Sequence, residues 1–433
     1  MQTQALPGFR DFYPADLALR THIFQTWRSV AARYGFEEYD GPPLEPLDLY
    51  TAKSGDEIVG QLYNFTDKGD RQVALRPEMT PTLARMVAAQ AGKLRKPIRW
   101  FSIPQLFRYE RQQRGRLREH FQLNCDLIGE AGPLGDAELI ALAIDVLRAF
   151  GLGPGDVRVR LSDRRVLSKL LQHRGVPPSG MSRAYEIIDK IERLRKEQID
   201  ELSSRPDVFA PATVSDLVDI SRIRGWDHLE SELAHSSELS KSGGHLKETY
   251  ESLSAMGLAE FVDVDLTIVR GLAYYTGVVF EVFDARRTLR AICGGGRYDD
   301  LLDAVGGVQL PAAGFGMGDV VLGELLREKG QIPPGGASID VFMAYITRED
   351  LPHVLTLAHQ LRDAAVRVEY ALTPQAVGKQ LKLADSRNVR FAVVVGPDER
   401  ARNEILIKDL RSGSQESIPM SSLANTIKAR MNG

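Results

Sequence analysis

The segment from Phe107 to Asp126, FRYERQQRGRLREHFQLNCD, combines basic side chains with the pattern of a β-hairpin. Apolar and polar residues alternate at both of its ends, which predicts two antiparallel strands joined by a long basic loop around Gly115. Because guanidinium groups bind phosphate oxygens in bidentate pairs, this loop suits a polyanion. On the second strand Gln122, Asn124 and Asp126 share one face and are predicted to line a polar pocket. By itself such a hairpin is also typical of a solvated loop or a general nucleic-acid contact.

Two other segments place chemistry-bearing residues beside turns. A strand, a turn at Arg76-Pro77 and a helix from about Pro81 are predicted in sequence, with Glu78 just ahead of the helix and Thr80 as its expected cap. A carboxylate at this place is commonly only a compensation of the helix dipole. The glycine run at 294–296 removes the side chains that would keep a ligand off the backbone.

Composition limits the classes of function. The 433 residues are 43% hydrophobic and 26% charged, which is typical of a soluble globular protein of two to four domains. A net charge of -3 argues against coating nucleic acid through bulk charge, so any RNA contact must come from local patches. Two cysteines, Cys125 and Cys293, provide neither a disulfide framework nor a metal cluster, which predicts no zinc and fits a reducing compartment. No targeting pattern and no apolar run of membrane-spanning length is found, so we expect a cytoplasmic protein.

Apolar periodicity predicts the elements that must position these residues. They are a helix at 15–34, a strand at 36–39, a helix at 134–151, a strand at 157–161, an inserted helical module at 175–257 with a polar, weakly patterned stretch at 236–246, and a β-rich block at 261–283. A Pro/Gly linker at 330–336 separates a final domain at 337–433. Its strands at 339–346, 367–371, 391–396 and 404–409 alternate with helices at 350–365, 374–386 and 420–431. The predicted fold class is α+β, with a small α/β domain at the C-terminal side.

The basic hairpin resembles motif 2 of the class II aminoacyl-tRNA synthetases, in the form Phe-Arg-x-Glu-Arg-x-x-x-Gly-Arg of the histidyl-tRNA synthetases. The helix and strand that end at Pro42 resemble motif 1, which builds the dimer interface in class II enzymes. The segment at 377–384 resembles the anticodon-binding domain of the same synthetases. The resemblance therefore covers nearly the whole chain.

Three further segments resemble the same family. Residues 270–275, Arg-Gly-Leu-Ala-Tyr-Tyr, are similar to its histidine-specific signature Arg-Gly-Leu-Asp-Tyr-Tyr, with Ala273 in place of the aspartate. Residues 294–299 resemble its Gly-Gly-Arg-Tyr-Asp segment. Residues 314–321 fall where motif 3 has a strand and a helix, but Val321 stands where an arginine against ATP is expected.

The resemblance implies a catalytic domain at 1–329, an antiparallel sheet flanked by helices and interrupted by the insertion at 175–257, followed by an anticodon-binding domain at 337–433. It implies a histidine–tRNA ligase, which forms histidyl-adenylate from L-histidine and ATP and transfers histidine to the 3′ end of tRNA(His). ATP would bring Mg²⁺ with its phosphates. A homodimer is implied by motif 1, and neither a membrane nor DNA is an expected partner.

The resemblance also assigns roles to individual residues. The α-phosphate arginines are Arg108 and Arg270, which are the catalytic residues that it implies. Glu78 would hold the α-ammonium group of the substrate. The histidine-binding set is Glu78, Thr80, Gln122, Asp126, Tyr274, Tyr275 and Tyr298, and the ATP-binding set is Arg108, Glu110, Arg116 and Arg270. Because Val321 carries no charge, Arg116 or Arg111 is expected to supply part of the missing positive charge.

A rival interpretation is a non-catalytic regulator that resembles the synthetase-like subunit of ATP phosphoribosyltransferase in histidine biosynthesis. Val321 and Ala273 favour it. The arginine-rich loop and the C-terminal domain argue against it, because a regulator without tRNA work needs neither. A general RNA-binding module is a poorer third interpretation, since it would not require Glu78 or the 270–275 segment.

Overall fold

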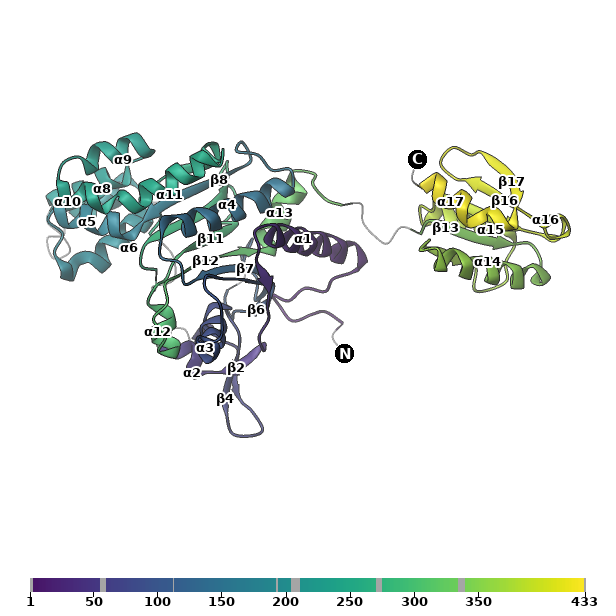
Figure 1. The fold of residues 1–433 in the computed structure, drawn as a ribbon, viewed down its shortest axis with the longest axis horizontal. Helices are drawn as coiled ribbons and strands as arrows, with labels where there is room; N and C mark the ends of the chain where they lie inside the picture. Colours follow the sequence, from purple (N-terminus) through teal and green to yellow (C-terminus); the bar gives the residue numbers. More distant parts are fainter. Residues whose placement is uncertain are drawn as a thin grey trace. The chain divides into compact units, whose positions relative to one another are not determined.

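The computed structural model of the chain describes residues 3–54, 60–111, 113–191, 194–203, 211–269, 275–333 and 339–431. The chain forms two compact units that divide between Pro334 and Gly335, within the range that the sequence indicates as a linker (Figure 1). The larger unit contains every residue predicted to contact ATP or histidine.

A nine-stranded sheet organises the larger unit. Its strands are β1 (Glu37–Glu38), β5 (Ile98–Ser102), β6 (Gln105–Phe107), β7 (Glu119–Ile128), β8 (Val157–Asp163), β9 (Val262–Val264), β10 (Val278–Asp284), β11 (Cys293–Arg297) and β12 (Ala312–Gly318). The order is β1-β5-β7-β12-β11-β10-β8-β9, with β6 paired to β7. The edge pairs β1 with β5 and β8 with β9 are parallel, and the other pairs are antiparallel. The predicted antiparallel architecture is confirmed, with these two parallel edges as the exception.

One face of the sheet buries the main core under three helices. Helix α4 (Pro133–Ala149) packs on β7, β11 and β12, and α1 (Pro14–Arg33) and α13 (Asp319–Glu328) lie beside it (Figure 1). The core-facing residues of β7 are its odd-numbered ones, such as Leu123 and Cys125. Helix α4 is apolar around most of its circumference, because the sheet covers one side and α1 and α11 (Gly244–Ala255) cover others.

A second group of helices covers part of the other face. Helix α3 packs against α12 and α2, and its Leu83 and Val87 share a small core with Ile98 and Ile128 of the sheet. A three-stranded sheet of order β2-β4-β3 leads into α3. The bounds are α2 (Asp48–Ser54), α3 (Thr80–Gln90), α12 (Leu301–Gly306), β2 (Leu44–Pro46), β3 (Asn64–Thr66) and β4 (Gln72–Leu75).

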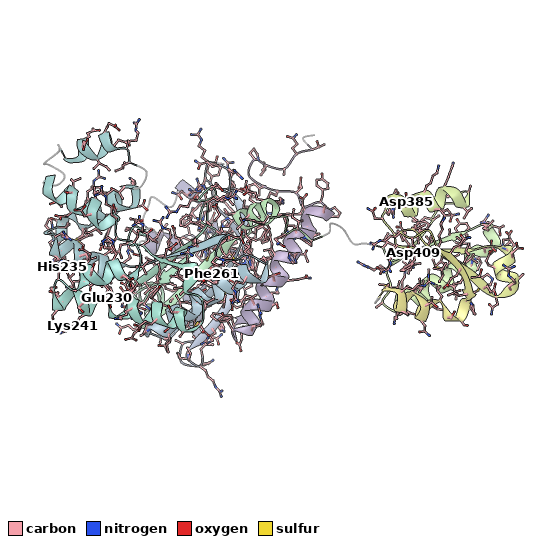
Figure 2. The ribbon with its side chains drawn as sticks, turned by 90° about the horizontal axis from the view of Figure 1, so that it is seen from above. Glu230, His235, Lys241, Phe261, Asp385 and Asp409 are labelled. Carbon is pink, nitrogen blue, oxygen red and sulfur yellow. The ribbon has the colours of Figure 1, made fainter. Side chains whose placement is uncertain are left out.

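The predicted insertion is helical. Helix α5 (Arg164–His173) comes immediately before the insertion. The helices of the insertion are α6 (Met181–Ile191), α7 (Lys196–Ser203), α8 (Pro211–Ser221), α9 (Trp226–Leu233), α10 (Ser237–Ser242) and α11 (Gly244–Ala255), with single 3-10 turns at Pro178–Gly180 and Ala259–Phe261. The polar stretch at 236–246 forms α10 and the start of α11, because the side chain of Ser236 caps α10 and Leu239 and Leu246 are buried. Figure 2 shows Glu230, His235 and Lys241 gathered at the end of this module, away from Phe261.

The smaller unit is a five-stranded sheet of order β14-β13-β15-β16-β17. Its elements are β13 (Val341–Tyr345), β14 (Val368–Tyr370), β15 (Phe391–Val395), β16 (Glu404–Asp409), β17 (Gln415–Pro419), α14 (Leu351–Asp363), α15 (Val377–Ser386), α16 (Pro397–Arg402) and α17 (Leu423–Met431), with 3-10 turns at Arg348–Asp350 and Met420–Ser422. The parallel strands β14, β13 and β15 form the predicted βαβ pattern. The sequence did not indicate β17 or α16, because both are short, mostly polar and solvent-facing. Asp385 of α15 and Asp409 of β16 belong to this unit (Figure 2).

Candidate active site

Glycines of β12 make room for the polar side chains of β7. A Cβ atom at Gly314 would meet the carboxylate of Asp126 and lie 2.8 Å from the carbonyl oxygen of Cys125. At Gly316 it would lie 2.6 Å from Cδ of Gln122. The side chains of Asp126 and Gln122 therefore cross the bare backbone of the neighbouring strand, on the face opposite to the main core.

The carboxylate of Asp126 and the hydroxyl of Tyr298 form a buried pair. Tyr298 donates its O–H to Oδ1 of Asp126, and the two residues are only 2% and 4% exposed, respectively. Burial raises the pKa of Asp126 to about 7, although the hydrogen bond from Tyr298 acts in the opposite direction. Near neutral pH this carboxyl is poised between its charged and neutral forms.

Tyr275 lies beside this pair. Burial raises the pKa of its phenol above the ordinary value, and the nearby carboxylates of Glu78 and Asp126 raise it further. Tyr275 therefore stays protonated and can donate its O–H. Its ring is also close to Gly296, where a Cβ atom would lie 3.2 Å from Cδ1 of Tyr275. Arg164 holds the segment in place by donating to the carbonyl oxygen of Tyr275 at 2.8 Å.

The turn ahead of α3 positions Glu78. Buried Arg76 anchors the turn by donating to the carbonyl oxygens of Gly41 at 2.7 Å and Gln105 at 3.0 Å. Glu78 itself is buried, and its carboxylate is close enough to Tyr275 to contribute to the raised pKa of that phenol. Thr80 follows as the first residue of α3, so the prediction that it caps the helix is wrong. Met79, the residue before it, already has helical backbone angles and makes no side-chain cap. Pro81 fixes φ in the first turn, which favours this earlier start of the helix.

Arg108 connects the basic hairpin to that turn. Its Nε donates to the carbonyl oxygen of Pro77 at 3.0 Å, and its backbone N–H donates to the carbonyl oxygen of Arg118 at 2.9 Å. The strands on both sides of the loop, β6 and β7, pair in antiparallel fashion as the alternation predicts. The guanidinium of Arg108 is therefore bound to Pro77, the residue immediately before Glu78, at the point where the basic loop begins.

Two arginines of the loop form ion pairs with carboxylates. Arg116 forms an ion pair with Glu110, so two residues predicted to bind ATP are bonded to each other. Arg114 bonds Glu324 at 3.2 Å and Glu328 at 2.7 Å, both on α13. The loop thus lies against α13 through exposed ion pairs.

His120 and Arg10 belong to this region but were not selected from the sequence. Burial, together with the positive charges of Arg108, Arg10 and Arg116, lowers the pKa of His120 to about 3, so its imidazole is neutral. Arg10 bonds two buried carboxylates, Glu119 at 2.6 Å and Asp319 at 2.8 Å. No local signal marks Arg10, because its partners lie 109 and 309 residues further along the chain.

The described site residues form two groups. We name the first the Asp126 cluster; its members are Glu78, Gln122, Asp126, Tyr275 and Tyr298. The second is the basic loop, residues 108–118, which contains Arg108, Glu110 and Arg116. Arg270, Ala273 and Tyr274 lie outside the described residues. Thr80 is next to the first group along the chain.

The described ranges contain neither a cluster of metal ligands nor a membrane-spanning helix. There, no three His, Cys, Asp or Glu side chains are arranged to hold a metal ion. In the same part of the chain no helix is both long and apolar enough to cross a membrane. Cys125 and Cys293 are free thiols within the core.

Known families match the chain over nearly its full length. A family model described as histidyl-tRNA synthetase matches residues 8–319, and one described as an anticodon binding domain matches residues 340–430. A histidine–tRNA ligase of Opitutus terrae is 44% identical over 418 residues, which is 96% of each chain. The crystal structure of a histidyl-tRNA synthetase from Nostoc sp. PCC 7120 superposes with a TM-score of 0.85 and 27% identity, covering 99% of this chain and 100% of that one.

A further structure bears on the regulator interpretation. It is described as an ATP phosphoribosyltransferase regulatory subunit/histidyl-tRNA synthetase from Bacillus halodurans, and it aligns with a TM-score of 0.74 and 23% identity over 92% of this chain and 98% of that one. At this identity the likeness shows a shared fold alone and does not separate the two functions. The family model and the 44% identical ligase do separate them, in favour of the synthetase. The chain therefore belongs to the histidyl-tRNA synthetase family of aminoacyl-tRNA ligases.

Proposed function

We propose that the chain activates L-histidine with ATP and transfers it to the 3′ end of tRNA(His). The histidine carboxylate attacks the α-phosphate in line, diphosphate leaves, and a terminal ribose hydroxyl of the tRNA then attacks the adenylate. This chemistry needs positioning and charge neutralisation rather than a protein nucleophile. The observation that carries the proposal is the hydrogen bond from Tyr298 to Asp126. It joins the Gly-Gly-Arg-Tyr-Asp segment to the motif 2 strand, and so brings together two residues of the expected histidine-binding set that are far apart in the sequence.

In this proposal the Asp126 cluster selects histidine. Glu78 accepts hydrogen bonds from the α-ammonium group. Asp126, with its pKa near 7, and Tyr298 hold the imidazole, while Gln122 and the protonated Tyr275 complete the polar wall. An amino acid with an apolar side chain would leave these buried groups without partners, which is a strong basis for rejection.

The basic loop holds the nucleotide in this proposal. Arg108 and, outside the described residues, Arg270 neutralise the α-phosphate, and loss of one such donor costs about 3 kcal/mol in the transition state. Arg116 exchanges Glu110 for phosphate oxygens when ATP binds. ATP enters as its Mg²⁺ complex, with the ion held by the phosphates of the substrate.

We extend the proposal to assembly and location. The smaller unit would contact the tRNA, as expected for an anticodon binding domain. The α1, β1 and Pro42 region, which resembles motif 1, would form a homodimer, and light scattering would then give twice the 48.1 kDa chain mass. Two free, buried thiols fit a reducing compartment such as the cytoplasm.

The test is ATP–diphosphate exchange by the full chain with each amino acid in turn. We expect exchange with histidine alone, and a loss of about 100-fold in kcat/KM for histidine in an Asp126→Asn variant. An Asp385→Asn variant, which removes an exposed carboxylate of the smaller unit, serves as the control and should keep full exchange. Folded protein that binds histidine but catalyses no exchange would contradict the proposal and favour the regulator.

A further inference from the structure

Val321 occupies a place that the basic loop touches directly. It is the third residue of α13, is buried, and offers only an aliphatic surface. The loop turns at Gly115, which has a φ of +71°, directly beside Val321. A Cβ atom at Gly115 would lie 3.2 Å from Cγ2 of Val321. The loop therefore approaches the start of α13 closely, but at Val321 it finds neither a hydrogen-bond donor nor a charge.

Arg290 reaches the same point from another element. It precedes β11, and the backbone N–H of Gly318 bonds the carbonyl oxygen of Ile292 at 3.2 Å, which fixes this segment beside the start of α13. The Cδ and Cγ atoms of Arg290 would lie 3.6 and 3.9 Å from a Cβ atom at Gly115. Its guanidinium donates to Oε1 of Gln113 in the loop. Arg290 and Val321 thus flank the same glycine, and Arg290 brings the charge that Val321 lacks.

The partners of Arg290 differ from those of the other arginines at the loop. Arg114 and Arg116 are bonded to carboxylates, so an anion that binds them must first displace a negative group. Within the described residues Arg290 forms no ion pair, and its bond is to the neutral side-chain amide of Gln113. It is also exposed to solvent. An incoming phosphate therefore replaces a neutral acceptor at Arg290, whereas at Arg114 and Arg116 it must compete with a carboxylate.

We propose that Arg290 binds the β- and γ-phosphates of ATP and supplies there the positive charge that is absent from Val321. This inference rests on the proposed function, because it assigns a substrate contact for that reaction. The guanidinium turns from Gln113 to the phosphates, where its fork donates hydrogen bonds to two phosphate oxygens at once. Charge on the departing diphosphate is then neutralised from the connection between β10 and β11 instead of from α13.

The test compares ATP with AMP, because only ATP carries the phosphates in question. Dissociation constants for both nucleotides are measured by titration calorimetry, and exchange kinetics are measured at varied ATP and varied histidine. For Arg290→Ala we expect about a 100-fold loss of kcat/KM for ATP, unchanged AMP binding and an unchanged KM for histidine. Arg290→Lys keeps the charge without the fork and should lose less. Arg286→Ala removes another exposed arginine from the same connection and should match the unmodified chain.

Three results would overturn the assignment. If the dissociation constant for ATP of the Arg290→Ala variant is within twofold of that of the unmodified chain, Arg290 makes no phosphate contact. An equal loss of ATP and AMP binding shows a structural role. An ATP-selective loss in Arg111→Ala, but not in Arg290→Ala, assigns the charge to Arg111. Absence of exchange in the unmodified chain would refute the proposed function, and the ATP and AMP dissociation constants would still decide the role of Arg290.

Discussion

The Asp126 cluster and the basic loop hold their polar groups in opposite ways. In the cluster, Asp126 and Tyr298 are bonded to each other inside the protein and are almost fully buried. In the loop, Arg114 is 67% exposed and pairs with glutamates at the surface. A buried polar group is costly to move or to leave unpaired, whereas an exposed ion pair exchanges readily with water and salt. The groups of the cluster are therefore held in place by the protein itself, whereas the ion pairs of the loop can exchange partners.

The largest expected effect is from Gly314→Ala, which tests whether the cluster is as rigid as its packing indicates. The new Cβ atom would meet the carboxylate of Asp126 and the backbone of Cys125, and backbone cannot yield as a flexible side chain does. We expect a loss of more than about 100-fold in kcat/KM for histidine, since misplacement by about 1 Å is enough for such a loss. Exchange kinetics at varied histidine measure it.

Gly318→Ala is the control for that variant. A Cβ atom at Gly318 meets nothing within 4 Å, so the same substitution on the same strand should leave the kcat/KM for histidine unchanged. If Gly314→Ala retained the histidine kinetics of the unmodified chain, the cluster would be as adaptable as the loop, and the contrast between the two regions would fail.

An intermediate effect is expected in the pH dependence of stability. Because the pKa of Asp126 is about 7 in the folded chain and about 3.9 in an unfolded one, the folded state binds the proton more tightly between these values. The stabilisation from this proton is complete below about pH 4 and is lost as pH rises to 7. Relative to Asp126→Asn, the free energy of unfolding should therefore fall by up to about 4 kcal/mol over this window. Urea unfolding at a series of pH values measures it, and parallel curves for the two chains would refute the shifted carboxyl.

The smallest effect is expected from Arg114→Ala. Its pairs with Glu324 and Glu328 are exposed, so the free energy of unfolding should change by no more than about 0.5 kcal/mol. Urea unfolding at low and high salt provides the measurement. A loss above about 2 kcal/mol would mean that the loop pairs are structural, and that the loop is not free to exchange them for phosphate.

Sequence patterns predicted elements wherever the signal is local. The hairpin around Gly115 follows from alternation, and α4 follows from a long apolar period ended by Gly151. Thr80 was predicted to cap α3 because its hydroxyl is typical of a cap. It is instead the first residue of the helix, because Pro81 in the first turn favours an earlier start. Strand β17 was missed since an exposed edge strand has no buried face to impose alternation.

The sequence by itself determined the family, the order of its elements and the residue types of the site, because motifs and periodicities are local properties of a chain. Only the tertiary structure decided which residues meet. Tyr298 and Asp126 are 172 residues apart, Arg290 and Gln113 are 177 apart, and Arg10 and Asp319 are 309 apart. These pairs are set by the strand order β7-β12-β11 and by the packing of α13 against β7 and β12, and no local pattern encodes either. The neutral His120 and the pKa of Asp126 have the same origin, since both depend on burial and on charges that come from distant parts of the chain.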